Sequence, residues 1–207
     1  MSTHNNADPD PWRNRTREAG RGGPAFGEFI EAVRLLQDRV TGARPPDDEV
    51  AALAARVQTL ADELLPWQVS EWDAAVGTRQ DLPGRGNPLL PPLIIDEWTA
   101  QRVVGRVVFR RFYIGGNGAA HGGTLPLLFD EVLGKLSNSG DRTVSRTAFL
   151  TVNYRRITRI GVEHTIVAEV ARVEGRKRWL TARLYDEDRN VTADAEGLFL
   201  ELKPGQP

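Results

Sequence analysis

The sequence predicts an α+β fold: one long helix wrapped by a curved antiparallel sheet, with a helical hairpin added at the N-terminus. Three observations lead to this prediction. Two segments near the N-terminus have apolar residues at helical spacing, five segments after residue 100 have the composition of β-strands, and one apolar helical segment, at about residues 122–138, interrupts the strands.

The composition is that of an ordinary globular protein and lacks the residues that several chemistries need. A formal net charge of −1 provides no global field to attract nucleic acid or an anionic membrane. The chain has no cysteine and only three histidines (His4, His121 and His164), which argues against disulfides, cysteine nucleophiles and a metal site. No apolar run suits a membrane span or a signal peptide. We therefore expect a cytoplasmic protein with no cofactor, no metal and no nucleic-acid partner.

The N-terminal part is predicted to consist of a mobile tail, a helical hairpin and a linker. Residues 1–23 are polar and rich in Gly, Pro and Arg, as mobile tails are. Residues 24–66 contain two helical patterns separated by TGARPPD, with Asp47 as the candidate N-cap of the second helix. The hairpin is either a lid or dimerisation element, or an extension that covers a sheet or stabilises an oligomer. Residues 67–92, rich in proline, indicate an irregular linker laid over the surface.

Residues 93–203 form the predicted main domain. Its strand-like segments are 101–113, 143–157, 164–173, 177–186 and 191–202, and VEGRK (173–177) and DEDRN (186–190) are natural hairpin turns. A strand, one long helix and then four antiparallel strands make the hotdog arrangement.

Apolar and polar residues alternate in the segment 143–157, as in a strand with one apolar face. Ala148, Leu150, Val152 and Tyr154 form the apolar set. Thr147, Asn153 and Arg155 occupy the intervening positions, so we expect these three residues on one strand face, away from the apolar set.

The segment GGNGAAHGGTLPLLFDEVLGKL, residues 115–136, has the residues that suggest chemistry. Gly122 and Gly123 at the start of a helix let the backbone approach a ligand, and the first N–H groups of the helix are unpaired donors at the positive end of its dipole. These features are typical of an oxyanion site, although glycines can also serve only close helix–sheet packing. Asp130 follows in an apolar stretch, where a carboxylate is costly without a partner or a task.

The spacing within this segment predicts a dimer. The helix rises about 13 Å between the glycine turn and Asp130, so Gly122 N–H and Asp130 of one chain cannot both touch a single carbonyl group. In a twofold dimer, the helix N-terminus of one chain can face Asp130 of the other, which gives two equivalent composite sites.

These features resemble the PaaI-like acyl-CoA thioesterases of the hotdog superfamily, most closely thioesterase superfamily member 4, over residues 93–202. The matching features are GAAHGG, Asp130 nine residues after His121, Thr147 on the next strand, VNYRR (152–156) and VEGRK. The resemblance implies hydrolysis of an acyl-CoA to a carboxylic acid and CoA. It implies that Asp130 is the catalytic carboxylate, that Gly122 N–H holds the thioester oxygen and that Thr147 positions water or substrate.

The resemblance further implies a CoA site formed by Asn153, Arg155, Arg176 and Lys177, with Gly123 also in contact with substrate. With Arg156 and Arg178, the basic residues among these form a local cluster suited to phosphates, or else a solvated sheet edge with two basic turns.

Two residues of the glycine-rich segment have open roles. Many PaaI-like enzymes have an amide several residues before the histidine, whereas Gly115 and Gly116 occupy that region here and Asn117 is the only amide. Asn117 either supplies the second oxyanion contact or forms a turn. The ring of His121 either orients the oxyanion turn through a hydrogen bond or fills the junction of helix and sheet; we favour the orienting role over proton transfer.

Asp130 has two possible routes of catalysis. Burial beside an apolar helix would make it a suitable general base, and direct attack would form an anhydride. The sequence has no Gly-x-Ser-x-Gly elbow. The alternatives to a thioesterase are a non-catalytic acyl-CoA sensor, a hotdog hydratase or dehydratase using His121 with Asp130, and an interaction protein built around the hairpin. The expected partners are the acyl-CoA substrate and a second copy of the chain, in a homodimer or a dimer of dimers.

Overall fold

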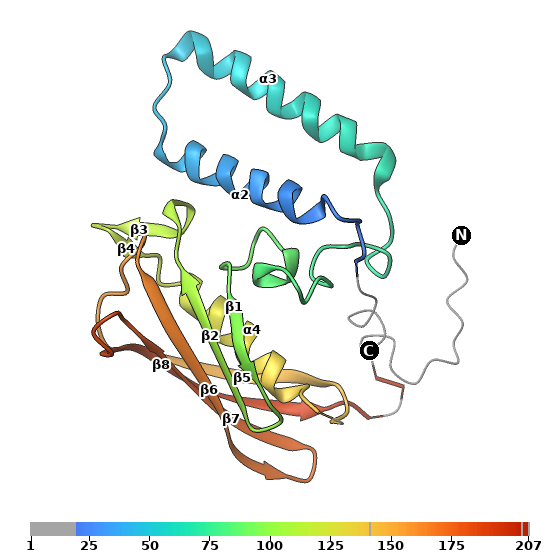
Figure 1. The fold of residues 1–207 in the computed structure, drawn as a ribbon, viewed down its shortest axis with the longest axis vertical. Helices are drawn as coiled ribbons and strands as arrows, with labels where there is room; N and C mark the ends of the chain where they lie inside the picture. Colours follow the sequence, from blue (N-terminus) through green and yellow to red (C-terminus); the bar gives the residue numbers. More distant parts are fainter. Residues whose placement is uncertain (1–19, 141, 204, 207) are drawn as a thin grey trace.

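The computed structural model describes residues 20–140, 142–203 and 205–206, and its core is one helix wrapped by an antiparallel sheet (Figure 1). The six strands of this sheet are ordered β1-β2-β6-β7-β8-β5. Their bounds are β1 Ile94–Trp98, β2 Arg102–Val108, β5 Ser145–Tyr154, β6 Glu163–Glu174, β7 Lys177–Tyr185 and β8 Val191–Glu201. The predicted hotdog fold is confirmed. The predicted mobile tail lies outside the described residues up to residue 19.

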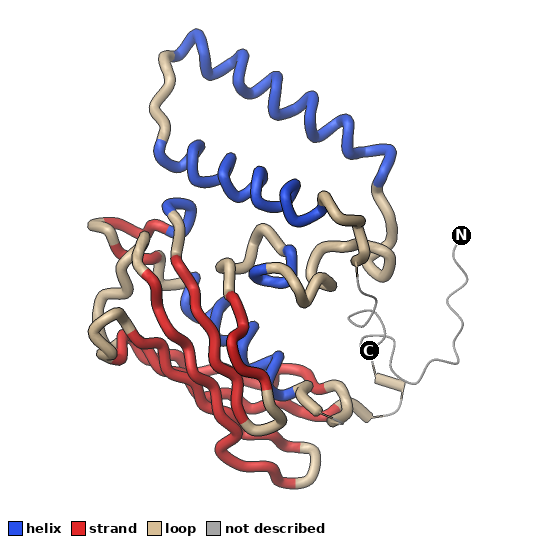
Figure 2. Tube along the Cα trace, viewed as in Figure 1, coloured by secondary structure: helices blue, strands red, loops and turns tan. Residues whose placement is uncertain are grey.

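Helix α4 (Thr124–Ser137) lies against one side of the curved layer of strands and supplies the centre of the core (Figure 2). Six of its apolar residues are at most 2% exposed: Leu125, Leu128, Phe129, Val132, Leu133 and Leu136. They recur at steps of three and four, and they pack against apolar residues of β2, β6 and β8. Because these buried apolar residues occupy most of the helix surface, the charged residues Asp130, Glu131 and Lys135 lie together on the side away from the core.

The predicted strands all form, and one strand of the main sheet, β1, was not predicted, nor were the two short strands of a separate ribbon before α4. The five strand-like segments correspond to β2, β5, β6, β7 and β8. Strand β1 has the sequence IIDEW, and it lies at the edge of the sheet beside β2. A five-residue edge strand with two acidic residues has too little apolar periodicity to be recognised in a sequence.

The N-terminal helical hairpin is confirmed, with helices α2 (Phe26–Gly42) and α3 (Asp47–Leu64). Helix α2 docks on the body through Ile30 and Arg34, both buried, whereas α3 buries no residue within the chain (Figure 1). The expected N-cap role of Asp47 is wrong. Pro46, with ψ of 151°, ends the extended connection, so the helix begins one residue earlier than expected and Asp47 is its first residue.

The segment 67–92 is more than a linker over the surface, and that expectation is corrected in part. Thr78, Arg79 and Leu90 are buried, and the guanidinium of Arg34 donates hydrogen bonds to the carbonyl oxygens of Pro83 and Asn87 at 2.9 and 3.1 Å. These contacts bond the segment to α2 and fix its course past α4.

Candidate active site

A short ribbon of two strands leads into the glycine turn before α4. Strands β3 (Ile114–Gly116) and β4 (Ala119–Ala120) pair, and Asn117 (φ 48°) and Gly118 (φ 73°) make the tight turn between them. Asn117 therefore has the turn role, because its backbone is in the left-handed region that asparagine tolerates. Gly115 must be glycine, since a Cβ there would lie 2.7 Å from the Cα of His121.

Hydrogen bonds fix the glycine turn and leave one N–H group free. Nδ1 of His121 accepts a hydrogen bond from Gly123 N–H at 3.0 Å, and the hydroxyl of Tyr154 donates to the carbonyl oxygen of Gly122 at 2.8 Å. In the described part of the chain, Gly122 N–H donates to no acceptor. The exposed donor at the start of α4 is therefore that of Gly122, because Gly123 N–H is occupied by His121.

The ring of His121 is exposed, so it does not fill the junction of helix and sheet. Its hydrogen bond to Gly123 N–H gives it the orienting geometry instead. Tyr154 performs a similar task from β5, and the sequence reasoning did not single it out. The only signal for Tyr154 was its place within VNYRR.

Asp130 and Thr147 form the second half of the candidate site. The hydroxyl of Thr147 donates a hydrogen bond to Oδ1 of Asp130 at 2.8 Å. Asp130 is exposed within the single chain, so its expected burial is wrong at this level of assembly. The apolar rows of α4 face the sheet, and Asp130 lies on the side that the chain leaves open.

A β-bulge at Ala148 turns Thr147 towards α4. Thr147 pairs with Phe199 and Phe149 with Leu198, so Ala148 is an extra residue on β5 and the alternation of faces reverses there. Thr147 consequently lies on the helix side of the sheet. Its alternation with the apolar residues of the strand had predicted the opposite face.

Asn153 and Arg155 lie on the other face of the sheet. Asn153 donates a hydrogen bond to Oδ1 of Asp194 at 2.8 Å, and Arg155 forms an ion pair with the same carboxylate. Ala193 and Ala195, on either side of Asp194, are buried in the core, so Asp194 points outward. The expectation that Thr147, Asn153 and Arg155 share a face is therefore wrong, because it assumed an unbroken strand.

The predicted basic cluster is divided between the two ends of β8. Arg155 N–H donates to the carbonyl oxygen of Thr192 at one end, and Glu201 N–H donates to that of Arg176 at the other. The nine intervening steps span about 30 Å. Arg178 is 3% exposed, and its guanidinium donates hydrogen bonds to the carbonyl oxygens of Ser137 and Thr143. Because it is buried and bonded within the chain, Arg178 has a structural role. The prediction that these basic residues form a single cluster within one chain is therefore wrong.

The side chain of Asp194 also affects the predicted CoA contacts. The pKa of its carboxyl is lowered, first by the hydrogen bond from Arg155 and also by that from Asn153. Both predicted CoA contacts are thus bonded to a neighbouring strand within the chain, and they stay predictions.

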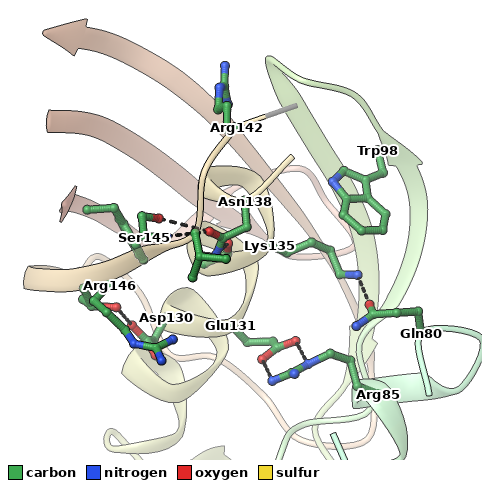
Figure 3. A pocket seen from close by; sticks show the side chains of 14 residues that line it. Gln80, Arg85, Trp98, Asp130, Glu131, Lys135, Asn138, Arg142, Ser145 and Arg146 are labelled. Atoms are coloured by element: carbon green, nitrogen blue, oxygen red, sulfur yellow. Dashed lines mark hydrogen bonds and ion pairs between the residues drawn. The ribbon is translucent and has the colours of Figure 1, made fainter. Parts of the chain in front are cut away.

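A pocket of about 390 Å³ adjoins Asp130 and Thr147 and continues along α4 (Figure 3). Its lining includes four further charged or polar side chains that the sequence reasoning missed: Gln80, Arg85, Glu131 and Lys135. Figure 3 shows Glu131 facing Arg85 and Lys135 reaching towards Gln80. A signal was present for two of them, because Glu131 and Lys135 interrupt the same apolar helix as Asp130.

Within residues 20–140, 142–203 and 205–206, no three His, Asp or Glu side chains gather in a way that could hold a metal ion. Among the helices of the same residues, none combines the length and apolarity that crossing a membrane requires.

Comparison with known proteins relates this fold to thioesterases. The family model described as thioesterase superfamily matches residues 117–193. A search of curated proteins gives no match. Among solved structures, a thioesterase superfamily protein has a TM-score of 0.74 and 24% sequence identity, and the match covers 88% of this chain and 98% of that one.

Two bacterial structures with CoA groups match about half of this chain. A Streptococcus mutans protein bound to acetyl CoA has a TM-score of 0.51 and 16% identity, covering 55% of this chain and 91% of that one. A hypothetical thioesterase protein with coenzyme A from Streptococcus pneumoniae has a TM-score of 0.50 and 18% identity, covering 52% and 86%. These likenesses establish the hotdog fold. The first extends beyond residues 93–203 and so includes part of the N-terminal extension.

Proposed function

We propose that the protein is an acyl-CoA thioesterase that hydrolyses its substrate to a carboxylic acid and CoA in a site shared by two copies of the chain. The similarity of residues 117–193 to the thioesterase superfamily supports this reaction class. The solved structures that hold acetyl CoA or coenzyme A support a CoA ester as the substrate. The closer resemblance to thioesterase superfamily member 4 stays a prediction.

The observation that carries the proposal is that the two halves of the site lie at opposite ends of an edge strand. Thr147, near the start of β5, bonds to Asp130, and Tyr154, its last residue, bonds to Gly122. The seven steps between them span about 23 Å. Asp130 and Gly122 of one chain therefore cannot act on the same thioester.

Antiparallel pairing of β5 with β5 of a second copy would join the two halves. Among the strands that the structure describes, β5 has a neighbour on one side only, β8, and an unpaired edge is a template for another strand. A twofold pairing centred near Leu150 sets Thr147 of one copy opposite Tyr154 of the other. Each Asp130 would then face the Gly122 turn of the other subunit, out of contact with bulk water.

The same pairing would reunite the divided basic residues. It carries Arg155 and Arg156 of one subunit to the end of the sheet at which Arg176 and Lys177 of the other subunit lie. Four cationic side chains would then gather where the CoA phosphates need them. The homodimer thus explains both the composite site and the basic cluster.

In this site, the Gly122 N–H and the positive end of the α4 dipole would stabilise the negative charge that develops on the thioester oxygen. Asp130 would take a proton from water as the water oxygen adds to the carbonyl carbon, or would itself attack and form an anhydride that water then opens. Either route expels the CoA sulfur as the leaving group. The Thr147 hydroxyl holds one carboxylate oxygen and so fixes the direction of the other.

Release of free thiol from a panel of acyl-CoA esters tests the proposal. We expect turnover by the wild-type protein, and a loss of at least about a hundredfold in Asp130→Asn with the folded dimer retained. Binding of acyl-CoA without thiol release from any ester would identify a sensor instead. Activity of Asp130→Asn within about threefold of wild type would reject Asp130 as the catalytic group.

A further inference from the structure

Lys135 is a half-buried cation in the same pocket as Asp130. Its ammonium donates a hydrogen bond to Oε1 of Gln80 at 2.5 Å and lies 3.9 Å from the ring centroid of Trp98. Burial is the main cause that lowers the pKa of Lys135 to about 8. A cation in such surroundings is costly, so its presence calls for a specific reason.

The neighbouring carboxylate does not neutralise Lys135 directly. Both oxygens of Glu131 accept hydrogen bonds from Arg85, at 2.6 and 2.7 Å, in a bidentate ion pair. In the part of the chain that the structure describes, no carboxylate lies within 4.0 Å of the Lys135 ammonium. Among the described residues, Lys135 therefore has a neutral amide and an aromatic face as its partners, and no paired anion.

The backbone conformation around Arg85 holds this side chain against Glu131. Arg85 has φ of 55° between Gly84 and Gly86, which also have positive φ, and its guanidinium also donates to the carbonyl oxygen of Gly77 at 2.8 Å. A left-handed arginine is strained and persists because its contacts hold it. The strained turn positions Arg85 to occupy Glu131 and so leaves Lys135 without a carboxylate.

The pocket has the size and charge for a small anionic group. Its volume of about 390 Å³ lies in the range of small-molecule sites. Among the described residues that line it, four are basic, Arg85, Lys135, Arg142 and Arg146, and two are acidic, Asp130 and Glu131. With Glu131 held by Arg85, the field at the Lys135 end of the pocket is positive.

The separation of Lys135 from Asp130 along α4 sets the length of an acyl group that could reach both residues. Asp130 and Lys135 both line the pocket and lie five residues apart on α4. This separation is about 7.5 Å along the helix axis, which an acyl chain of about four to six carbons can span. A substrate with its thioester at Asp130 thus brings the far end of a short acyl chain to Lys135.

We propose that this pocket receives the acyl group of the thioester and that Lys135 selects acyl groups ending in a carboxylate, such as the half-esters of short dicarboxylic acids with CoA. The inference rests on the proposed thioesterase function. The substrate carboxylate supplies the missing counter-ion of Lys135, while Gln80 and Trp98 hold the ammonium in place.

Matched pairs of CoA esters test this selection on the full-length protein. Glutaryl-CoA and valeryl-CoA have the same number of acyl carbons and differ in the terminal carboxylate. We expect kcat/KM of the wild type to favour glutaryl-CoA by at least about tenfold, and Lys135→Met to lower this ratio at least tenfold, mainly through KM for glutaryl-CoA. Lys135→Arg, which keeps the charge, should retain most of the ratio.

Lys203→Met is the matched control, because it makes the same substitution at an exposed site near the C-terminus. It should leave the ratio unchanged. A wild type that hydrolyses valeryl-CoA at least as well as glutaryl-CoA, or a Lys135→Met variant that keeps the ratio, would overturn the selection and leave the thioesterase proposal intact.

Binding to an Asp130→Asn protein keeps the inference testable even without turnover. Calorimetry with both esters should show that adding Lys135→Met weakens the binding of glutaryl-CoA at least tenfold more than the binding of valeryl-CoA. Equal weakening of both esters would overturn the role of Lys135. If binding shows the selection but the wild type releases thiol from no ester of the acyl-CoA panel, the proposed function fails while the binding role of Lys135 stands.

Discussion

Two inactive variants should restore activity to each other when they share a dimer. The first variant is Asp130→Asn, and the second is Gly122→Pro, which removes the oxyanion N–H. The structure makes the proline suitable: Gly122 N–H donates no hydrogen bond among the described residues, its φ is not in the left-handed region, and an added Cβ meets nothing nearer than Tyr154 at 3.8 Å. Each variant alone should lose about a hundredfold or more of wild-type activity.

The expected recovery follows from the geometry of β5 and α4. If each site takes Asp130 from one subunit and Gly122 from the other, a mixed dimer has one site with both defects and one site with neither. Random mixing at equal amounts makes half of all dimers mixed, so activity should return to about a quarter of wild type. If each site took both groups from one chain, every site would have a defect and activity would stay near 1%.

The assay mixes the two variants under mild denaturation, refolds them and measures thiol release after circular dichroism and native mass spectrometry have shown folded mixed dimers. A mixture of Asp130→Asn with Asp130→Ala is the matched control and should stay inactive. Folded mixed dimers with about 1% activity would refute the composite site and the β5 pairing on which it depends.

Three further outcomes follow from individual contacts. Thr147→Ala should lower kcat about tenfold with a smaller change in KM, because the hydroxyl orients Asp130 in the transition state; a change confined to KM in steady-state kinetics would contradict this. Arg85→Met should lower the free energy of unfolding by about 3 kcal/mol because it leaves Glu131 unpaired, and the double variant Arg85→Met/Glu131→Met should recover much of the loss in urea titrations; equal losses would show that packing dominates. Lys135 has a folded-state pKa of about 8 against 10.5, so the unfolded chain binds more protons between these values, and wild-type stability should rise relative to Lys135→Met from about pH 8 to 10.5; parallel pH profiles would reject the lowered pKa.

The sequence was sufficient for the elements whose signal is local. The apolar periodicity of α4 and of the hairpin helices appears within single turns of helix, and the strand segments are bounded by turn residues. The same local signal placed Asp130 on α4 and Gly122 at its N-terminus. The approximate rise between them was enough to predict a site shared by two chains.

Tertiary structure decided whatever depends on which residues pair across the fold. The bulge at Ala148 exists only relative to β8, so no pattern within β5 could show that Thr147 faces α4. The pairing of β8 with its neighbours likewise places Arg155 and Arg176 at opposite ends of that strand. The sequence had predicted that these two residues belong to one cluster.

The pocket beside Asp130 depends on the longest-range contacts. Arg85 reaches Glu131 across 46 residues of sequence, and Gln80 reaches Lys135 across 55. A sequence shows that Glu131 and Lys135 are charged residues in an apolar helix, but it cannot show that a distant loop gives Glu131 a charged partner and Lys135 a neutral one. The charge that remains free in the pocket is therefore a property of the folded chain, because pairing of side chains is settled only when the loop packs against the helix.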